Sequence, residues 1–254
     1  MPDKQHLTQS LNQKGYSIRI PKNDLLLRDG DVNDCRTSIK NDIDAFFVNA
    51  LLSYGSAISS LRKNNYSWAY IQSYYCIFYL AKLLLAEQDI YLYYVDTIPY
   101  KIKISYGESF CKQKGNSHSI ILSLFKKQFE RNNNICSQIE GINNIDWLNH
   151  KREEINYRLS PMPDPNPPAP LFRYNNDIRK WLASYESEIL YSFSEEHCFI
   201  AYTTFLIRNI VKQYRTSNKK NSYLSYEVLQ HLQKNIADEK GPLPIWNSLK
   251  DINI

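Results

Sequence analysis

The strongest constraint on this chain is a stretch, residues 67–87, that is apolar on nearly every side of a helix. Its large side chains occur all around the helical repeat instead of forming one stripe. A helix of this kind is stable in water only when other elements surround it. The sequence therefore predicts a helix at the centre of its domain, built from Trp68, Ala69, Ile71, Tyr74, Tyr75, Ile77, Phe78, Leu80, Ala81, Leu83 and Leu84.

The segment before it predicts another long helix, over residues 38–63. Apolar residues recur there at helical spacing, and Asp42 and Asp44 lie near its start, where negative charge suits the helix dipole. Asn64 and Asn65 end this helix. So short a connection predicts that the two helices are antiparallel.

Residues 1–38 are polar and irregular. Within them, the alternation of Tyr16–Ile20 predicts a short strand, and Asp29–Asp34 predicts an exposed turn. The segment that begins at Asp29 is similar to a twelve-residue calcium-binding loop. However, the sixth position of such a loop needs glycine and holds Asp34, and the twelfth needs glutamate and holds Lys40.

Residues 90–106 have a different period. Residues 90–95 are rich in strand-forming side chains, and residues 101–106 alternate strictly between polar and apolar side chains after Pro99. We therefore expect a β-hairpin inserted between helices.

The remaining sequence predicts helices over residues 117–132, 144–160, 177–193, 195–214 and 223–236. Six of the 11 prolines lie within residues 161–170, where neither a helix nor a central strand can form. The expected fold class is all-α. We expect an irregular segment 1–38, an antiparallel helical bundle 39–160 with the hairpin at 90–106, a proline-rich strap 161–174, and a helical C-terminal region 175–254.

Composition restricts the class of protein. The 254 residues have a net charge of +5 and are 43% hydrophobic, as in ordinary folded domains. No apolar run approaches the about 18 residues of a membrane span, and the first residues lack a signal-peptide pattern. We expect a cytoplasmic protein without membrane contact. The five widely spaced cysteines include no CxxC pair, which favours reduced, mostly buried thiols.

Most catalytic motifs are absent from the sequence. It contains no phosphate-binding loop, no dinucleotide fingerprint, no nucleophile elbow and no HExxH. The five histidines show no metal-ligand spacing. The sequence therefore predicts neither a metal nor a cofactor.

Three segments resemble, in order, the second, third and last core helices of HEPN-domain proteins. They are residues 66–84 with the aromatic core of Tyr74, Tyr75 and Phe78, then residues 117–125, and then residues 151–158. The similarity covers about residues 39–160, which is under half of the chain.

This resemblance implies an up-and-down helical bundle that is commonly dimeric. Many members of the family are metal-independent ribonucleases of toxin–antitoxin, CRISPR-linked and antiphage systems. Their signature is an arginine followed, after four to six residues, by a histidine. Two protomers bring their copies together so that a ribose 2′-hydroxyl attacks the adjacent phosphate. This chemistry needs a proton carrier and a cation for the phosphate charge.

The sequence departs from that signature. Arg152 is present, but Tyr157 stands in the histidine position. Tyrosine, with an unperturbed pKa of about 10, is a poor proton acceptor at neutral pH. A variant catalytic site would comprise Arg152, Asn156 and Tyr157. His150 lies about 200° around the helix from Arg152, so it would complete the site only from a neighbouring chain.

Arg152 also lies on an apolar helix face, between Leu148 and Ile155. An arginine in such a place is rarely buried without a partner. Three explanations are open. The side chain pairs with a core carboxylate such as Asp44 or Glu87, it points into a dimer cleft, or it binds RNA phosphate.

A basic row follows helical spacing near the C-terminus and is formed by Arg208, Lys212, Arg215 and Lys219. Such a row would track a nucleic-acid backbone, and a solvated helix face is the simpler explanation. Lys101 and Lys103 of the hairpin, among tyrosines, offer a similar surface.

Three functions from different classes follow. The first is a HEPN-like subunit of a prokaryotic defence or toxin–antitoxin assembly, which acts by dimerisation or subunit docking and contacts RNA or DNA. The second is a metal-independent ribonuclease with the variant site. The third is a nucleic-acid binder that acts through the basic C-terminal helix. The expected partner is a second copy or another subunit of a complex.

Overall fold

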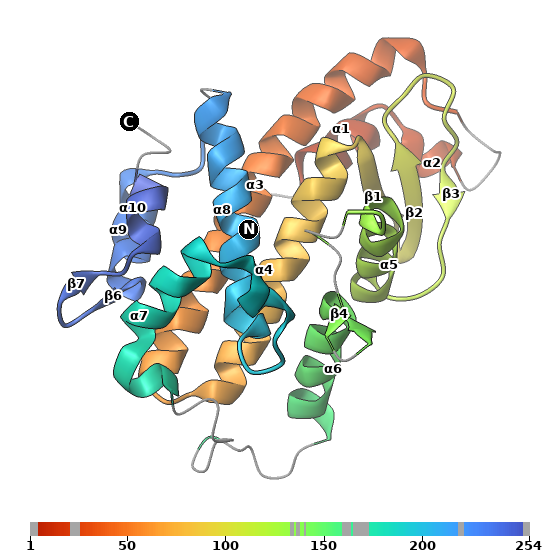
Figure 1. Cartoon of the computed structure of the whole chain (residues 1–254). Coiled ribbons are helices and arrows are strands. Elements are labelled where there is room, and N and C mark those ends of the chain that lie inside the picture. The colour runs from red at the N-terminus through yellow and green to blue at the C-terminus, as the bar shows by residue number, and fades with distance from the viewer. Residues whose placement is uncertain are drawn as a thin grey trace. The chain divides into compact units, whose positions relative to one another are not determined.

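The computed structural model of the chain describes residues 5–20, 26–132, 135, 138–139, 141–158, 164, 173–217 and 221–250, with the backbone alone at residues 19 and 173–177. These residues are mostly helical and include three small antiparallel sheets (Figure 1). The predicted all-α class with a small hairpin is confirmed, and the HEPN-like arrangement stays a prediction. Within these ranges, a search for a membrane-spanning helix finds none.

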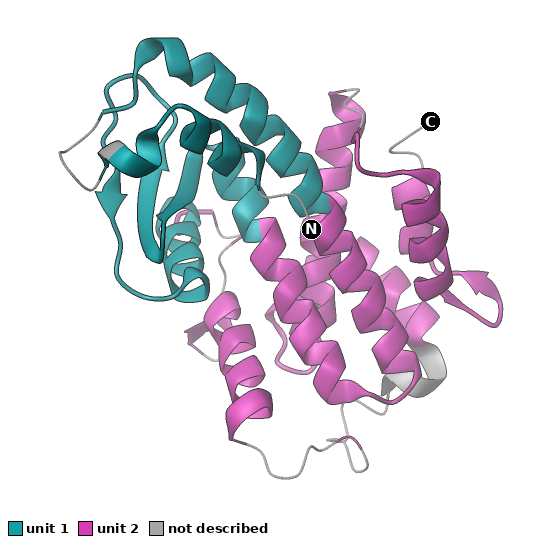
Figure 2. Cartoon of the chain, turned by 180° about the vertical axis from the view of Figure 1, so that it is seen from behind, with its two compact units in different colours: residues 1–47, 81–129 teal, residues 48–80, 130–254 magenta. Residues whose placement is uncertain are grey.

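The chain divides into two compact units, each made of two segments (Figure 2). Unit 1 comprises residues 1–47 and 81–129, and unit 2 comprises residues 48–80 and 130–254. The long helices α3 (Asp29–Arg62) and α4 (Tyr66–Glu87) contribute residues to both units. The consecutive segments expected from the sequence stay a prediction.

Helix α4 is buried on most of its circumference, as its composition predicts. The predicted apolar residues are buried or half-buried, apart from Trp68, which is 52% exposed near the start of the helix. The backbone N–H of Ser67 donates to Oδ1 of Asp164 at 3.1 Å, so one residue of the predicted proline-rich strap caps this helix. The rest of residues 161–172 lies outside the described residues.

Unit 1 contains a three-stranded antiparallel sheet. Its strands β1 (Ile90–Val95), β2 (Ile98–Lys103) and β3 (Cys111–Lys112) lie in that order. Tyr93 of β1 is opposite Tyr100 of β2. The hairpin predicted at residues 90–106 is therefore confirmed, and helix α5 (Ser117–Phe129) follows it, close to the predicted 117–132.

The predicted strand at Tyr16–Ile20 is wrong. The segment forms helix α2 (Tyr16–Arg19), which follows helix α1 (His6–Gln13). Gly15 adopts φ 75°, a left-handed conformation that suits glycine, and a single helical turn begins after it. This turn places Tyr16 in the core while Ile18 remains exposed, so the alternation in sequence does not correspond to a strand.

The predicted exposed turn at Asp29–Asp34 is also wrong, because α3 begins at Asp29 and not near residue 38. Val32, Cys35 and Ile39 are buried and continue the apolar stripe of the helix towards its N-terminus. Acidic residues in the first turn suit the positive end of the helix dipole.

Unit 2 is built around α8 (Cys198–Thr216), which is buried along most of its length. The hydroxyl groups of Tyr54 in α3 and Thr204 in α8 are hydrogen-bonded at 2.8 Å in the core. The other elements of this unit are β4 (Gln138–Ile139), β5 (Ile142–Asn143), α6 (Asn144–Tyr157), α7 (Arg173–Ser187), the 3-10 helix η2 (Ile189–Phe193), α9 (Tyr226–Asn235), β6 (Ala237–Asp238), β7 (Gly241–Pro242) and α10 (Ile245–Leu249).

Most predicted helices of this region occur with shifted ends. The helix predicted at 177–193 is divided into α7 and η2, with an extended residue, Glu188, between them. The sequence after the predicted last helix forms the β6–β7 turn and α10. Gly55 of α3 lies against α9, because a Cβ at this position would be 3.4 Å from Cβ of Asn235 and 3.5 Å from Leu232.

Candidate functional site

The candidate site lies in unit 2, where α6 meets α4 and α8. Tyr70 of α4 stacks on Phe199 of α8, with 4.2 Å between the ring centroids, and lies 6.3 Å from the Trp147 ring of α6. The side chain of Asn143 caps α6 by accepting a hydrogen bond from the Ile145 N–H at 3.0 Å. These contacts fix which face of α6 is turned towards α4.

Arg152 of α6 projects onto α4. Its guanidinium carbon lies 4.7 Å from the centre of the Tyr74 ring, and its side chain is 12% exposed. Nη2 lies 3.5 Å from Oε1 of Glu153, and Nε is buried without a hydrogen-bond partner. Leu148 and Ile155 on the same face are buried, so the predicted apolar face containing Arg152 is observed. A cation–π contact and a long ion pair hold the guanidinium.

Of the three explanations for Arg152, the structure shows a carboxylate contact, and the carboxylate belongs to Glu153. This residue is the next one along the same helix. The two core carboxylates considered from the sequence, Asp44 and Glu87, belong to unit 1. The dimer cleft and the phosphate contact stay predictions.

The partner of Arg152 is a neutral ring. Burial raises the pKa of Tyr74 to about 12, and the positive charge of Arg152 acts in the opposite direction. Tyr74 is therefore protonated at physiological pH, and its aromatic face meets the cation. This pair has no group that would accept a proton near neutrality.

The three predicted catalytic residues lie in the last two turns of α6 and differ in exposure. Arg152 is turned inwards, whereas Asn156 is exposed and Tyr157 is 77% exposed. Five positions along the helix place Tyr157 about 140° around α6 from Arg152. His150 is exposed too. The arginine and tyrosine of the motif therefore have different surroundings.

The residues of the predicted basic row have different surroundings in the structure. Arg208 and Lys212 are exposed on α8. Arg215 donates from Nη2 to the carbonyl oxygens of Asn247 at 3.1 Å and Ser248 at 2.9 Å, near the C-terminal end of α10. A cation suits this end of a helix. Lys219 lies outside the described residues.

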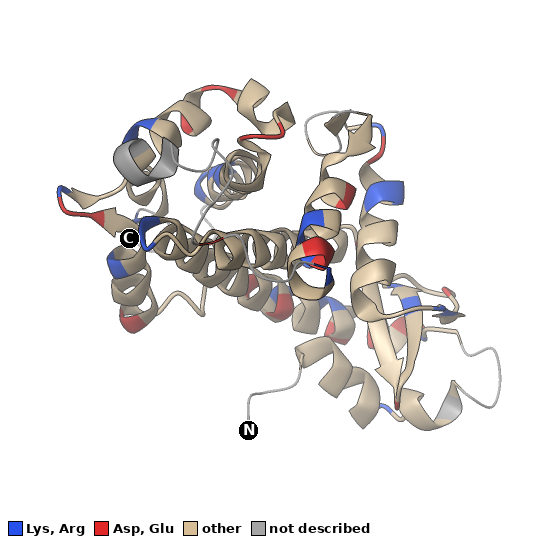
Figure 3. Cartoon of the chain, turned by 90° about the horizontal axis from the view of Figure 1, so that it is seen from below, with Lys and Arg blue, Asp and Glu red and all other residues tan. Residues whose placement is uncertain are grey.

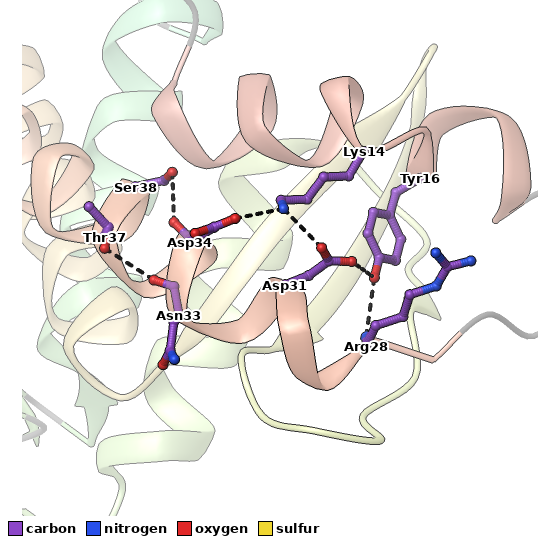
Figure 4. A network of polar contacts seen from close by, with 8 residues as sticks. All are labelled: Lys14, Tyr16, Arg28, Asp31, Asn33, Asp34, Thr37 and Ser38. Atoms are coloured by element: carbon purple, nitrogen blue, oxygen red, sulfur yellow. Dashed lines mark hydrogen bonds and ion pairs between the residues drawn. The ribbon is translucent and has the colours of Figure 1, made fainter.

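A polar cluster in unit 1 was missed by the sequence analysis (Figure 4). Lys14, after α1, donates from Nζ to Asp31 at 2.9 Å and to Asp34 at 2.7 Å, both in α3. The hydroxyl of Tyr16 donates to the second oxygen of Asp31 at 2.8 Å. These bonds raise the pKa of Lys14 and lower that of Asp31. The partners of Lys14 lie 17 and 20 positions away in sequence, so no local pattern indicates the cluster. The only sign of it in the sequence is the group of acidic residues at 29–34.

The same cluster borders an open pocket of about 390 Å³ between α1 and α3. Sites for small molecules are usually lined mainly by apolar and aromatic side chains. The lining of this pocket is polar, and its lysine already has two carboxylate partners. The pocket therefore lacks the features of a small-molecule site. Its lining residues are His6, Gln9, Ser10, Gln13, Lys14, Asp34 and Ser38.

Asp42 is a buried carboxylate of α3 that caps α1. It accepts hydrogen bonds from the backbone N–H groups of His6 at 2.7 Å and Leu7 at 3.0 Å, and from the Tyr91 hydroxyl at 2.8 Å. Gln5, at the N-cap position, makes no side-chain cap. Asp42 therefore supplies from another helix the acceptor that an N-cap residue normally provides.

Lys82 is a half-buried lysine of α4. Its Nζ lies 4.0 Å from the centre of the Phe46 ring. Burial lowers the pKa of Lys82 to about 8, and the negative charge of Asp42 acts in the opposite direction. No sequence signal beyond its position in an apolar helix marks this residue.

Among the described residues, no group of three or more His, Cys, Asp or Glu side chains is arranged to hold a metal ion.

Comparisons with known proteins add no family. A scan against protein-family models finds no match to this sequence, and searches among curated proteins and solved structures find none either.

Proposed function

We propose that this protein is a HEPN-like subunit of a prokaryotic defence or toxin–antitoxin assembly and that it acts by dimerisation or docking onto another subunit. The observation that supports this proposal is the geometry of α6. Arg152 packs against Tyr74, and Tyr157, in the histidine position of the family motif, is 77% exposed. In this proposal α6 packs on α4 through Arg152, and the position that holds the histidine in the family motif presents an aromatic side chain to solvent.

The chemistry of these groups favours docking over catalysis. A general base must titrate near the operating pH, and burial raises the pKa of Tyr74, the ring that Arg152 contacts, to about 12. Exposed tyrosines are, in contrast, enriched in protein interfaces, where they combine a large apolar ring with a polar end. Tyr157 at the end of α6 is suited to such a contact.

The test compares two exposed tyrosines of the same unit. Tyr157→Glu places a charge on the proposed docking surface, and Tyr226→Glu does the same on α9, where Tyr226 is 71% exposed. We expect the wild type and Tyr226→Glu to form a dimer or to co-purify with a partner from the native host. We expect Tyr157→Glu to lose that association by at least about tenfold in affinity, as buried interface anchors do.

Light scattering after size-exclusion chromatography measures this outcome, and circular dichroism checks the fold. The docking proposal fails if the wild type is a monomer that recovers no partner, or if the two variants behave alike.

Catalysis is tested separately with a panel of RNAs, with and without EDTA. We expect the RNAs to remain intact. Cleavage that is lost in a folded Arg152→Ala variant would overturn the non-catalytic proposal and establish the variant ribonuclease.

A further inference from the structure

The third strand of the sheet in unit 1 carries an exposed thiol. Among the cysteines that the structure describes, Cys111 is the exposed one. Its Sγ lies 3.6 Å from the hydroxyl oxygen of Ser109, which is exposed too. A cysteine thiol is intrinsically very nucleophilic, and exposure opens this one to reagents in solution. What it can do chemically therefore depends on the side chains beside it.

A lysine lies directly across the sheet from this thiol. In the register of β2 and β3, Lys101 is opposite Cys111. Figure 3 shows basic positions on the strands of this sheet. Directly opposite residues of an antiparallel pair point to the same face, with their Cβ atoms about 4.5–5.5 Å apart. Within the part of the chain that the structure describes, Lys101 forms no ion pair. The flexible stem of the lysine can therefore bring Nζ to a group bound on the sulfur.

The core of unit 1 holds both side chains on this face. Ile102, which follows Lys101, and Phe110, which precedes Cys111, are buried. The centre of the Phe110 ring lies 6.0 Å from that of Tyr93 in β1. Successive side chains of an extended strand point to opposite faces. The burial of these neighbours therefore turns the lysine and the thiol to the other face of the sheet.

Hydrogen bonds from Gln113 fix the short strand β3 beside β2. Its backbone N–H donates to the Pro99 carbonyl at 2.8 Å, and its side-chain Nε2 donates to the Cys111 carbonyl at 3.0 Å. The next residue along β3, Lys112, is opposite Tyr100 and so points to the face opposite the thiol. Lys112 is exposed as well. The chain thus supplies a lysine that is adjacent to the thiol in sequence but separated from it by the sheet.

We propose that Cys111 accepts an acyl group from an acyl thioester and passes it to Lys101. In the first step, the sulfur attacks the carbonyl carbon, a new C–S bond forms, and the bond to the departing thiol breaks. In the second step, the neutral amine of Lys101 attacks the same carbon, an amide bond forms, and the C–S bond to Cys111 breaks. The net reaction converts the thioester and the lysine ammonium into an amide, a free thiol and one proton, and Cys111 regains its thiol.

The cross-strand position makes Lys101 the favoured acceptor. An acyl group on Cys111 is held at a fixed distance from the amine, so the second step is intramolecular. Such steps proceed as if the reactant were present at a very high local concentration. A lysine elsewhere on the surface must meet the thioester by collision from solution. The site lies in unit 1 and does not depend on the proposed docking role of α6 in unit 2.

The test incubates the full chain with acetyl-coenzyme A and follows the acetylation of each lysine over time by peptide mapping with mass spectrometry. We expect Lys101 to be acetylated at least about tenfold faster than Lys112, which is the internal control. Cys111→Ser is expected to lower the rate at Lys101 to that at Lys112. Lys101→Arg keeps the positive charge and is expected to leave the acetyl group on Cys111 as a thioester, which hydroxylamine removes.

Three outcomes would each overturn the proposal. The first is equal acetylation rates at Lys101 and Lys112 in the wild type. The second is an unchanged rate at Lys101 in the Cys111→Ser variant, which would mean that the lysine reacts without the thiol. The third is a Lys101→Arg variant that carries no acetyl group removable by hydroxylamine. Circular dichroism confirms that each variant is folded, and both substituted side chains lie outside the core.

Discussion

Lys82 and Arg152 show two ways in which a single cation is accommodated beside an aromatic ring. Lys82 lies over Phe46 in unit 1, and burial lowers its pKa to about 8. Arg152 lies over Tyr74 in unit 2 and keeps a carboxylate neighbour. A lysine can lose its proton when it is buried, whereas an arginine remains charged. The lysine is therefore the residue whose contribution to stability depends on pH.

We expect Lys82→Met to stabilise the protein at pH 7 and to lose that advantage at high pH. The folded pKa of Lys82 is about 8, below the ordinary lysine value of 10.5. The cost of burying the charged amine is therefore fully present below pH 8 and disappears as the pH rises towards 10.5. We expect the variant to gain about 2 kcal/mol in free energy of unfolding at pH 7, after the lost contact with Phe46 is subtracted.

Urea unfolding of the two proteins at several pH values between 7 and 10 gives this difference directly. Comparing the two proteins removes the contributions of the other titrating groups. A difference that stays constant over this pH range would show that Lys82 is charged in the folded state.

At the scale of elements, the sequence predicts the helices and strands that show a regular apolar pattern of their own. Helices α4, α5 and α6 and the β1–β2 hairpin follow from their apolar patterns. Helices α1 and α2 and the first turns of α3 were missed, because partners from elsewhere stabilise them. The N-terminus of α1 is capped by Asp42, and Asp31 binds Lys14 and Tyr16.

The candidate site was predicted in part for the same reason. The helical spacing of Leu148 and Ile155 places Arg152 on an apolar face, and this is observed. The contact with Tyr74 joins two helices far apart in sequence, so no local pattern indicates it. The inward direction of Arg152 against the outward direction of Tyr157 also depends on how α6 packs.

The β6–β7 turn provides a test at this scale. Arg179 of α7 donates to both carboxylate oxygens of Asp238, at 2.9 and 2.6 Å, and to the carbonyl oxygens of Gly241 and Pro242, both at 2.9 Å. Bidentate pairs of this kind are among the stronger hydrogen bonds in proteins. We expect Arg179→Ala to cost about 2 kcal/mol in local stability of the turn.

Hydrogen exchange of the Leu243 amide, which donates to the Ile236 carbonyl across the turn, reports this loss. Lys180→Ala changes the exposed neighbour on the same helix and is the control. Equal exchange rates in the two variants would mean that the turn does not need the arginine.

At the scale of the whole molecule, the described cysteines lie in both units and differ in exposure. Cys35 of unit 1 and Cys76 and Cys198 of unit 2 are buried, and Cys111 is exposed. Burial raises the pKa of Cys35 to about 11, and it raises the pKa values of Cys76 and Cys198 further. Since the thiolate is the reactive form, these three thiols are protected by their charge state as well as by the packing around them.

We expect iodoacetamide to label Cys111 in the native protein at least about 100-fold faster than Cys35, Cys76 and Cys198, which react only after opening of the fold. Peptide mapping by mass spectrometry follows each site separately, and the Cys111→Ser variant identifies the fast one. Rapid labelling of Cys76 or Cys198 in the absence of denaturant would contradict the buried positions of these residues.

The capping of α1 by Asp42 has a consequence for biosynthesis. Helix α1 is far shorter than the roughly 12–15 residues that an isolated helix needs in water, and Tyr91, which bonds both Asp42 and Gln5, lies 86 positions beyond Gln5. At about 5–20 residues per second, a ribosome needs about 4–17 s to make that stretch. During those seconds the nascent N-terminal segment lacks its final partner, so it is the part of unit 1 that chaperones and proteases meet first.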